Sequence, residues 1–443
     1  MIKKIAYSLG AVATALSYQS FSAYIIFFYV DTIKLNASLA ALAMSVFGVW
    51  NAVNDPIAGF ISDRWRTPWG RRIPYIALGA VPLGLVYYLL WTPPFTSSNM
   101  GQLFAYFLVF ICLFDGLYTV VILNWASLFP EMFTGIEERA QVNTLRQSFG
   151  MLGLILGVAL PPVIYSVYGW SAMGTVFGII ISVIVLITLF GSAEKREFTR
   201  DEPLKLKEAM VKTFSSRSFL MFAAANLFIQ YVFTMVLAIV PFYAKYILNA
   251  GPHFTSAILL TTFITAIVMM FVWRYVAVAL GAKAGYMWAI AILAFSLLPF
   301  LFISSLRSAL ISASLVGAGL AGIILISDIL ISDVIDEDEL SSGRRREGIF
   351  FGFNAFITRF AIALEAASIG IMFTVSRYSP YVFHQTASFL SGLRLLLAGL
   401  PVIALIIAFS IMHYYPLSGI RVREMRRELA DLHRLKDEKI RRE

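Results

Sequence analysis

Long apolar runs recur along the whole chain, and each is about as long as a membrane's hydrocarbon core is thick. A helix needs about 20 apolar residues to cross a core of about 30 Å. Of the 443 residues, 59% are hydrophobic and only 14% are charged, whereas about a quarter are charged in soluble domains. The sequence therefore predicts an integral membrane protein with twelve spanning helices, at 5–30, 38–62, 73–92, 103–129, 144–168, 173–192, 218–248, 254–280, 284–304, 308–333, 348–376 and 386–414.

Lysines and arginines gather at every second end of these spans. They cluster at the N-terminus, at 64–72, 195–217 and 344–346, and from 421 onward, while the intervening loops hold isolated cations. The positive-inside rule assigns the clustered ends to the cytoplasm. We therefore expect a multi-pass protein of the cell membrane, with both termini cytoplasmic and with the lipid bilayer as a partner. The net charge of +9 then reflects topology, so no nucleic-acid partner is expected.

A long polar stretch at 191–217 divides the twelve spans into six and six, as in transporters built from two related bundles. The predicted parts are a first bundle at 1–192, a central cytoplasmic loop at 193–217, a second bundle at 218–414 and a tail at 415–443. Four histidines, one cysteine and no hydrolase or nucleotide motif leave few catalytic groups. We predict no enzymatic function and no cofactor.

The second span places polar side chains in an apolar setting. Asn51, Asn54 and Asp55 have i, i+3 and i+4 spacing, which puts them on one face of a helix. A carboxylate in lipid costs about 3 kcal/mol, so Asp55 should face a cavity or a cation. The alternative is that Asp55 lies near the membrane edge and is hydrated there.

Three separated stretches resemble one family. NDPIAGFISDRWRTPWGRRIP, LFPEMFTGIEERAQVNTLRQSFG and DVIDEDELSSGRRREGIFFGFNAFITR are similar to the glycoside, pentoside and hexuronide cation symporters of the major facilitator superfamily. The resemblance implies an all-α membrane fold of two six-helix bundles that works by alternating access. It also implies a charged cytoplasmic gate, for which the candidates are Asp63, Arg64, Arg71, Arg72 and Arg139.

The resemblance further implies a cation site. The family's two carboxylates, an asparagine and a threonine correspond to Asn51, Asp55, Asn54 and Thr119, so an amide replaces the first carboxylate. Oxygen ligands suit sodium, but one charge instead of two leaves a proton on Asp55, or no coupling, as alternatives. We expect no metal site other than sodium at Asp55.

The family's sugar-binding acids are missing, because their positions hold Ala15 and Ile122; Asn124 is a nearby replacement. Two pore cations, Arg146 and Arg359, remain, and arginine binds carboxylate or phosphate through a bidentate fork. This favours an anionic solute, unless intramembrane acids neutralise the arginines. Among the aromatic residues, Tyr18 and Trp125 are candidates to stack on a solute.

Other ionisable residues within the spans need a partner or water. We expect structural ion pairs for Asp115 and Glu365, whereas Lys245 and Arg274 can extend to an interface.

The sequence thus predicts a monomeric secondary transporter that moves a glycoside, hexuronide or related organic solute by cation-coupled symport. One alternative is a lysophospholipid or amphiphile transporter of the same fold. A different class of protein would be a membrane receptor or scaffold that does not transport.

Overall fold

The protein is built from helices in the computed structural model. The structure describes residues 1–64, 70, 72–133, 136–194, 216–342, 347–382, 385–425 and 427–429. No strand occurs among them, which confirms the all-helical prediction. The elements are α1 (Ile2–Ser8), α2 (Gly10–Ile26), the π-helix η1 (Phe27–Thr32), α3 (Ala37–Arg64), α4 (Ile73–Leu90), η2 (Ser97–Asn99), α5 (Met100–Met132), α6 (Ile136–Gly191), α8 (Arg217–Tyr246), α9 (Pro252–Leu280), α10 (Ala282–Leu297), η4 (Leu298–Leu301), α11 (Leu306–Ser342), α12 (Glu347–Val375), α13 (Ala387–Arg394), η5 (Leu395–Gly399) and α14 (Leu400–His413).

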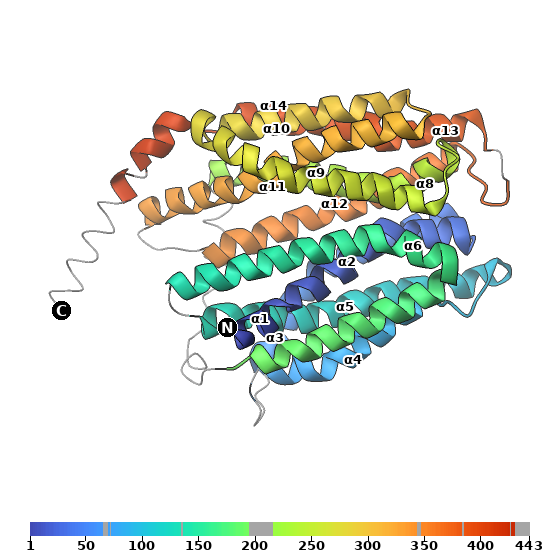
Figure 1. The fold of residues 1–443 in the computed structure, drawn as a ribbon, viewed down its shortest axis with the longest axis horizontal. Coiled ribbons are helices and arrows are strands. Elements are labelled where there is room, and N and C mark those ends of the chain that lie inside the picture. The colour runs from blue at the N-terminus through green and yellow to red at the C-terminus, as the bar shows by residue number, and fades with distance from the viewer. Residues whose placement is uncertain are drawn as a thin grey trace. The chain divides into compact units, whose positions relative to one another are not determined.

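Eleven helices among the described residues are long and apolar enough to cross a membrane. One of them, Gln141–Gly191, is 51 residues long and covers two of the predicted spans. Its backbone leaves the helical conformation at Gly169, where φ is 82° and ψ is 168°, and the chain reverses direction within α6 in Figure 1. Glycine enters this region at low cost because it has no Cβ. The eleven helices therefore account for the twelve predicted spans.

Most predicted boundaries lie within a few residues of the helix ends, but two differ more. Helix α11 continues to Ser342 instead of ending at 333, and α6 begins at Ile136 instead of 144. Both extensions are rich in charge, as in DEDEL. Hydropathy excludes such residues from an apolar span, but backbone hydrogen bonds continue a helix wherever its polar side chains reach water.

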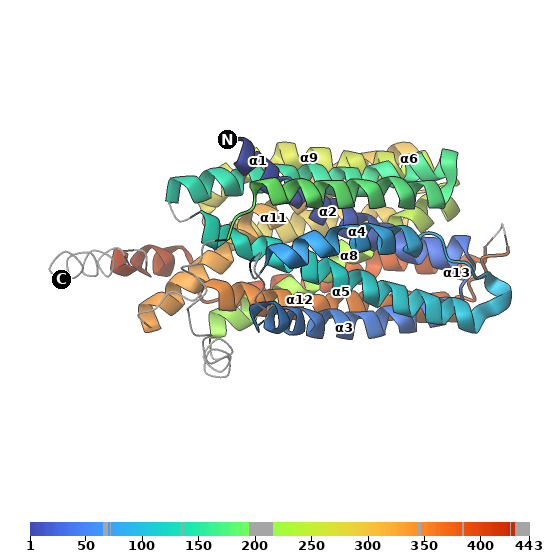
Figure 2. The ribbon, with the colours of Figure 1, turned by 90° about the horizontal axis from the view of Figure 1, so that it is seen from below.

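The first of two compact units, unit 1, comprises Met1–Glu202, Leu237–Leu260 and Ile362–Leu393. Within it, α3 and α4 pack against α5, and α1, α2 and α4 pack against α6; Figure 2 shows α3, α4 and α5 side by side. Small residues permit the contact between α4 and α6, since a Cβ on Gly84 would lie 2.3 Å from the carbonyl oxygen of Gly178. Close helix contact holds unit 1 together.

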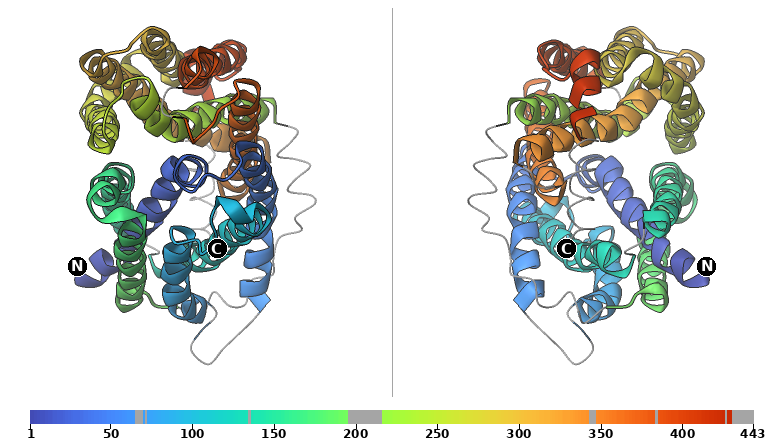
Figure 3. Two further views of the ribbon diagram at one scale, coloured as in Figure 1. Left: turned by 90° about the vertical axis from the view of Figure 1, so that its right-hand side faces the viewer. Right: turned by 90° about the vertical axis from the view of Figure 1, so that its left-hand side faces the viewer.

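The second unit, unit 2, comprises Pro203–Val236, Thr261–Ala361 and Arg394–Glu443. Helix α10 packs against α11 and α14, and the end-on views in Figure 3 show the helices of this unit as rods seen down their axes. The boundaries of the two units fall inside α8, α9 and α12. The division into bundles at 1–192 and 218–414, with the loop 193–217 and the tail 415–443, stays a prediction.

Candidate functional site

Four polar side chains meet between α3 and α5 in unit 1, and we call them the amide–carboxylate cluster. Asn51 and Asn54 come from α3, and Asp115 and Thr119 come from α5. Each is at most 5% exposed. The i, i+3 spacing of the asparagines and the i, i+4 spacing of Asp115 and Thr119 put each pair on one helix face. Packing of α3 on α5 then brings the two faces together.

Amide groups hold the carboxylate of this cluster. Asn51 Nδ2 donates to Asp115 Oδ1. Asn54 Nδ2 lies 3.0 Å from Asp115 Oδ2 and 2.9 Å from Thr119 Oγ1. It also lies 3.0 Å from the Asp115 carbonyl oxygen. Hydrogen bonds from neutral amides favour the ionised form of a carboxylate without cancelling its charge.

The amide–carboxylate cluster has the chemistry of a site for a hard cation. A carboxylate, a hydroxyl and two amides supply the oxygen ligands that sodium prefers, because rotation of an amide turns its oxygen toward the centre in place of its nitrogen. A proton carried by Asp115 is the alternative to sodium, since buried carboxylates form proton pathways in membrane proteins.

Three of the four residues expected at the cation site, Asn51, Asn54 and Thr119, therefore lie together. The side chain of Asp55 lies outside the described residues. The ion pair expected for Asp115 stays a prediction, and the amides of Asn51 and Asn54 donate to its carboxylate. The signal that sequence analysis missed is its position one turn before Thr119, on the same face of α5.

A second group in unit 1 surrounds Arg146 of α6. Its guanidinium carbon lies 4.7 Å from the Trp125 ring centroid and 4.8 Å from that of Phe129. Within the described part of the chain, Arg146 has no ion pair and its buried Nε has no hydrogen-bond partner. Cation–π contacts stabilise such a group by about 0.5–2 kcal/mol and leave its charge uncompensated.

Tyr7 fixes the platform under Arg146. Trp125 Nε1 donates to the Tyr7 carbonyl oxygen at 3.0 Å, and the Tyr7 hydroxyl donates to the Trp125 carbonyl oxygen at 2.9 Å. Their rings stack with centroids 5.3 Å apart. Trp125 is only 3% exposed, so it supports Arg146 and offers little surface to a solute.

The other predicted contact residues of unit 1 differ in their surroundings. Asn124 is 1% exposed; its Nδ2 donates to the Val120 carbonyl oxygen at 2.7 Å, while its buried Oδ1 accepts no hydrogen bond among the described residues. Tyr18 is half-buried, and its ring packs against Tyr118 at 5.4 Å. Arg359 lies on α12 in unit 2 and is half-buried.

Most of the predicted gate lies outside the described side chains, namely Asp63, Arg64, Arg71 and Arg139. Arg72 is described, and it stands directly before α4. Its backbone N–H and that of Ile73 donate to Glu194 Oε1 at 2.6 and 2.7 Å. An acidic group at a helix N-terminus satisfies free N–H groups and interacts favourably with the helix dipole. Glu194 therefore fixes the start of α4.

A second buried carboxylate, which sequence analysis did not single out, belongs to Asp31. Asp31 Oδ2 lies 2.5 Å from Lys245 Nζ, and Asp31 Oδ1 accepts hydrogen bonds from the hydroxyls of Tyr246 and, at 2.8 Å, Tyr378. We call these four residues, all in unit 1, the Asp31 cluster. Asp31 was missed because the first span was expected to end at 30. The chain instead continues as the π-helix η1, and Asp31 is 3% exposed.

Two basic residues near Asp31 have definite partners. Lys245 was expected to extend to the interface; its side chain is 42% exposed, but its ammonium group pairs with Asp31. Lys34 Nζ donates to the carbonyl oxygens of Asp31 at 2.6 Å and Pro380 at 2.5 Å. Burial, and then the charge of Asp31, raise the pKa of Tyr378 far above its ordinary value. Tyr378 therefore keeps the proton that it donates.

The chain matches the family model described as MFS/sugar transport protein over residues 6–419. It is 30% identical over 202 residues to the isoprimeverose transporter of Lactiplantibacillus pentosus, which covers 44% of this chain and 42% of that protein. It is 24% identical over 480 residues to the sodium-dependent lysophosphatidylcholine symporter 1 of Gallus gallus, covering 97% of this chain and 89% of that protein. The chain spans between 29% and 46% of the lengths of four curated relatives, the isoprimeverose transporter among them.

Solved structures of transporters share the fold. The nucleoside transporter NupG superposes with a TM-score of 0.69 at 15% identity, over 94% of this chain and 100% of that chain. A bacterial homolog of the human lysosomal transporter Spinster gives a TM-score of 0.69 at 12% identity, over 96% and 97%. These likenesses confirm the predicted major facilitator fold. The similar proteins are transporters, in agreement with the prediction that this chain is not an enzyme.

Proposed function

Because the chain belongs to the MFS/sugar transport family, we propose that it is a secondary transporter that couples solute movement to a cation by alternating access. The amide–carboxylate cluster is the observation that supports cation coupling. It presents a carboxylate, a hydroxyl and two amides in a site that is at most 5% exposed. A carboxylate held at this depth is costly and marks an ion or proton pathway in membrane proteins.

The cluster supports sodium or a proton as the coupling ion. The carboxylate of Asp115 matters to this question because it adds a negative charge to the site. With Asn51 in place of the family's first carboxylate, Asp55 was expected to act alone. Asp115 lies beside Asn51 and Asn54, so it returns a carboxylate to the site from α5 instead of α3. The name of the Gallus gallus relative specifies sodium dependence, which makes sodium the first cation to test.

Arg146 supports an anionic solute, such as a hexuronide or another organic anion. Its guanidinium rests on Trp125 and Phe129 with no acidic partner among the described residues. A bound carboxylate would supply the missing charge through a bidentate contact. Asn124 Oδ1, a buried acceptor that receives no hydrogen bond from the described residues, is suited to a solute hydroxyl. Arg359 is the second candidate cation.

The same proposal places the protein in the cell membrane as a monomer, with both termini cytoplasmic. Its partners are then a small solute, the coupling cation and the bilayer. Sodium or a proton enters as cargo, and no cofactor is needed for this mechanism.

The test is uptake by proteoliposomes that contain the purified protein. A glucuronide and its neutral glucoside analogue are each offered under a sodium gradient and, separately, under a proton gradient. We expect the glucuronide to accumulate faster, and the effective gradient identifies the coupling ion. Arg146→Gln should weaken glucuronide uptake much more than glucoside uptake, and equal losses would assign Arg146 to folding or gating. Arg359→Gln is tested in the same way.

A lysophospholipid substrate is the second candidate, and one observation favours it. The family's two acidic sugar-binding positions hold Ala15 and Ile122, and the lysophosphatidylcholine symporter aligns with 97% of this chain. Uptake of a labelled lysophospholipid, with neither glycoside transported, would replace the sugar proposal. Ligand binding without transport of any solute would instead indicate a receptor or scaffold.

A further inference from the structure

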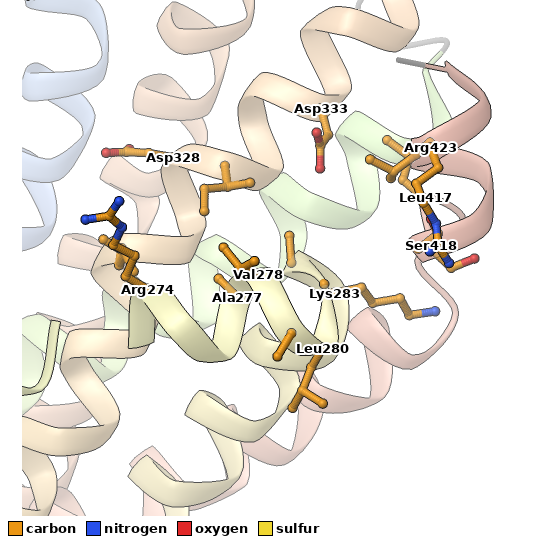
Figure 4. A pocket seen from close by; sticks show the side chains of 17 residues that line it. Arg274, Ala277, Val278, Leu280, Lys283, Asp328, Asp333, Leu417, Ser418 and Arg423 are labelled. Atoms are coloured by element: carbon orange, nitrogen blue, oxygen red, sulfur yellow. The ribbon is translucent and has the colours of Figure 1, made fainter. Parts of the chain in front are cut away.

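A pocket in unit 2 lies where α9, α10 and α11 meet the segment after α14. Its volume is about 650 Å³, within the range of roughly 300–1,000 Å³ that is typical of small-molecule sites. Figure 4 shows Arg274 and Asp328 at one side of this pocket, with Leu417 and Arg423 at the opposite side and Ala277 and Val278 between them. The positive-inside rule places these helix ends at the cytoplasmic face.

Arg274 and Asp328 are the notable pair of charges in this pocket. They come from α9 and α11, inside segments that are apolar and long enough to span a membrane. Both are exposed, and neither side chain has a hydrogen bond or an ion pair within the described part of the chain. Ionisable residues within spans normally have partners. A positive and a negative group facing one pocket without pairing call for a ligand that carries both charges.

The other cations of the pocket are already engaged. Lys283 Nζ donates to the carbonyl oxygens of His413 and Tyr415, each at 2.7 Å. Arg423 Nε donates to the Gly419 carbonyl oxygen at 2.9 Å. The Lys283 bonds tie α10 to the end of α14 and the residues after it, whereas the Arg423 bond lies within the segment after α14. Asp333 also lines the pocket, but it is only 2% exposed. Among the charged lining residues, Arg274 and Asp328 are the two whose side chains have no hydrogen bond or ion pair within the described part of the chain.

The surroundings indicate that the ligand is a lipid. Beside Arg274 on α9, Tyr275 is 74% exposed and Val278 is 84% exposed, and Leu280 is 53% exposed at the helix end. In a spanning helix such apolar side chains face hydrocarbon. A headgroup in the pocket would leave its acyl chains against this apolar face, whereas a soluble ion would leave the face unused.

We propose that this pocket binds a membrane phospholipid with a phosphoethanolamine headgroup. The guanidinium of Arg274 donates charge-assisted hydrogen bonds to the phosphate. The carboxylate of Asp328 accepts hydrogen bonds from the primary ammonium. Phosphatidylglycerol offers Asp328 no cation, and the quaternary ammonium of phosphatidylcholine has no N–H to donate. The two protein charges therefore select the zwitterion that pairs with both.

The experiment measures lipid retention by native mass spectrometry on the purified full-length protein. Equimolar phosphatidylethanolamine, phosphatidylglycerol and phosphatidylcholine of matched acyl chains are offered together. The wild type should retain phosphatidylethanolamine over each competitor by about tenfold, the selectivity expected from one charge-assisted hydrogen bond. Arg274→Gln should lose retention of both phosphatidylethanolamine and phosphatidylglycerol.

Asp328→Asn gives the sharper outcome. It should lose the preference for phosphatidylethanolamine and favour phosphatidylglycerol, because the carboxylate that repels a purely anionic headgroup is gone. The matched control is Arg307→Gln, an exposed arginine at the other end of α11, which should behave as the wild type. Equal retention of the three lipids by the wild type, or variants that leave the preference unchanged, would overturn the proposal. Either result would mean that Arg274 and Asp328 do not select the lipid headgroup.

Discussion

Two of the buried carboxylates in unit 1, those of Asp31 and Asp115, have different hydrogen-bond donors. Asp31 is 3% exposed and Asp115 is 1% exposed. Asp31 is bonded to the ammonium of Lys245 and two tyrosine hydroxyls, so the protein supplies its counter-charge. The donors described at Asp115 are the amides of Asn51 and Asn54, which are neutral.

The difference separates a structural carboxylate from one suited to an exchangeable ion. A buried carboxylate paired with a lysine is already compensated, and a further cation gains little there. Neutral amide donors favour the ionised form of a carboxylate and bring no counter-charge of their own. The Asp31 cluster thus joins parts of unit 1 that are far apart in sequence, and the amide–carboxylate cluster has the features of an ion site.

The largest effect is expected for Asp115→Asn. If Asp115 binds the coupling ion, gradient-driven accumulation in proteoliposomes should fall by at least about tenfold, because a charge-assisted contact is removed. Downhill exchange of solute should persist. Asp55 is the other candidate for coupling, and Asp55→Asn should give the same pattern. Full accumulation by Asp115→Asn would remove Asp115 from coupling.

Asp31→Asn should act on stability instead. Removing one partner of a buried pair costs about 3–5 kcal/mol. We expect about 2 kcal/mol here because the Lys245 side chain is 42% exposed and partly screened. The measurement is the unfolding free energy in detergent. Adding Lys245→Met should recover part of the loss, and a double variant no better than Asp31→Asn would show that the ion pair is not the cause.

Sodium should stabilise the protein only through the amide–carboxylate cluster. A ligand that binds only the folded state adds about 1.4 kcal/mol to the free energy of unfolding when its concentration is ten times its dissociation constant. The melting temperature of the wild type and of Asp31→Asn should therefore rise with sodium, whereas that of Asp115→Asn should not, with potassium as the control. No response in the wild type would favour proton coupling.

The smallest effect is expected for Tyr378→Phe. The change keeps the ring that packs 4.6 Å from Phe389 and removes one donor to Asp31, so the loss should be about 1 kcal/mol of unfolding free energy. Tyr381→Phe is the matched control because Tyr381 is 69% exposed and should leave stability unchanged. Equal effects of the two variants would assign the loss to something other than the Asp31 hydrogen bond.

The sequence by itself determined the spans, because a helix that crosses hydrocarbon must be apolar over its whole length, and it also placed Asn51 and Asn54 on one face of α3. Spacing within one helix is a local property, so such predictions need no tertiary contact. The same pattern predicted the turn at Gly169, because the spans 144–168 and 173–192 leave the chain to reverse between them.

Tertiary structure alone decided which side chains meet. Asp115 reaches Asn51 across 64 positions, and Asp31 reaches Lys245 across 214. Hydropathy reports whether a residue suits a membrane, but it carries no information on which helices pack together. The proposed ion site therefore depends on the packing of α3 on α5, and the Asp31 cluster depends on the contact of η1 with the end of α8.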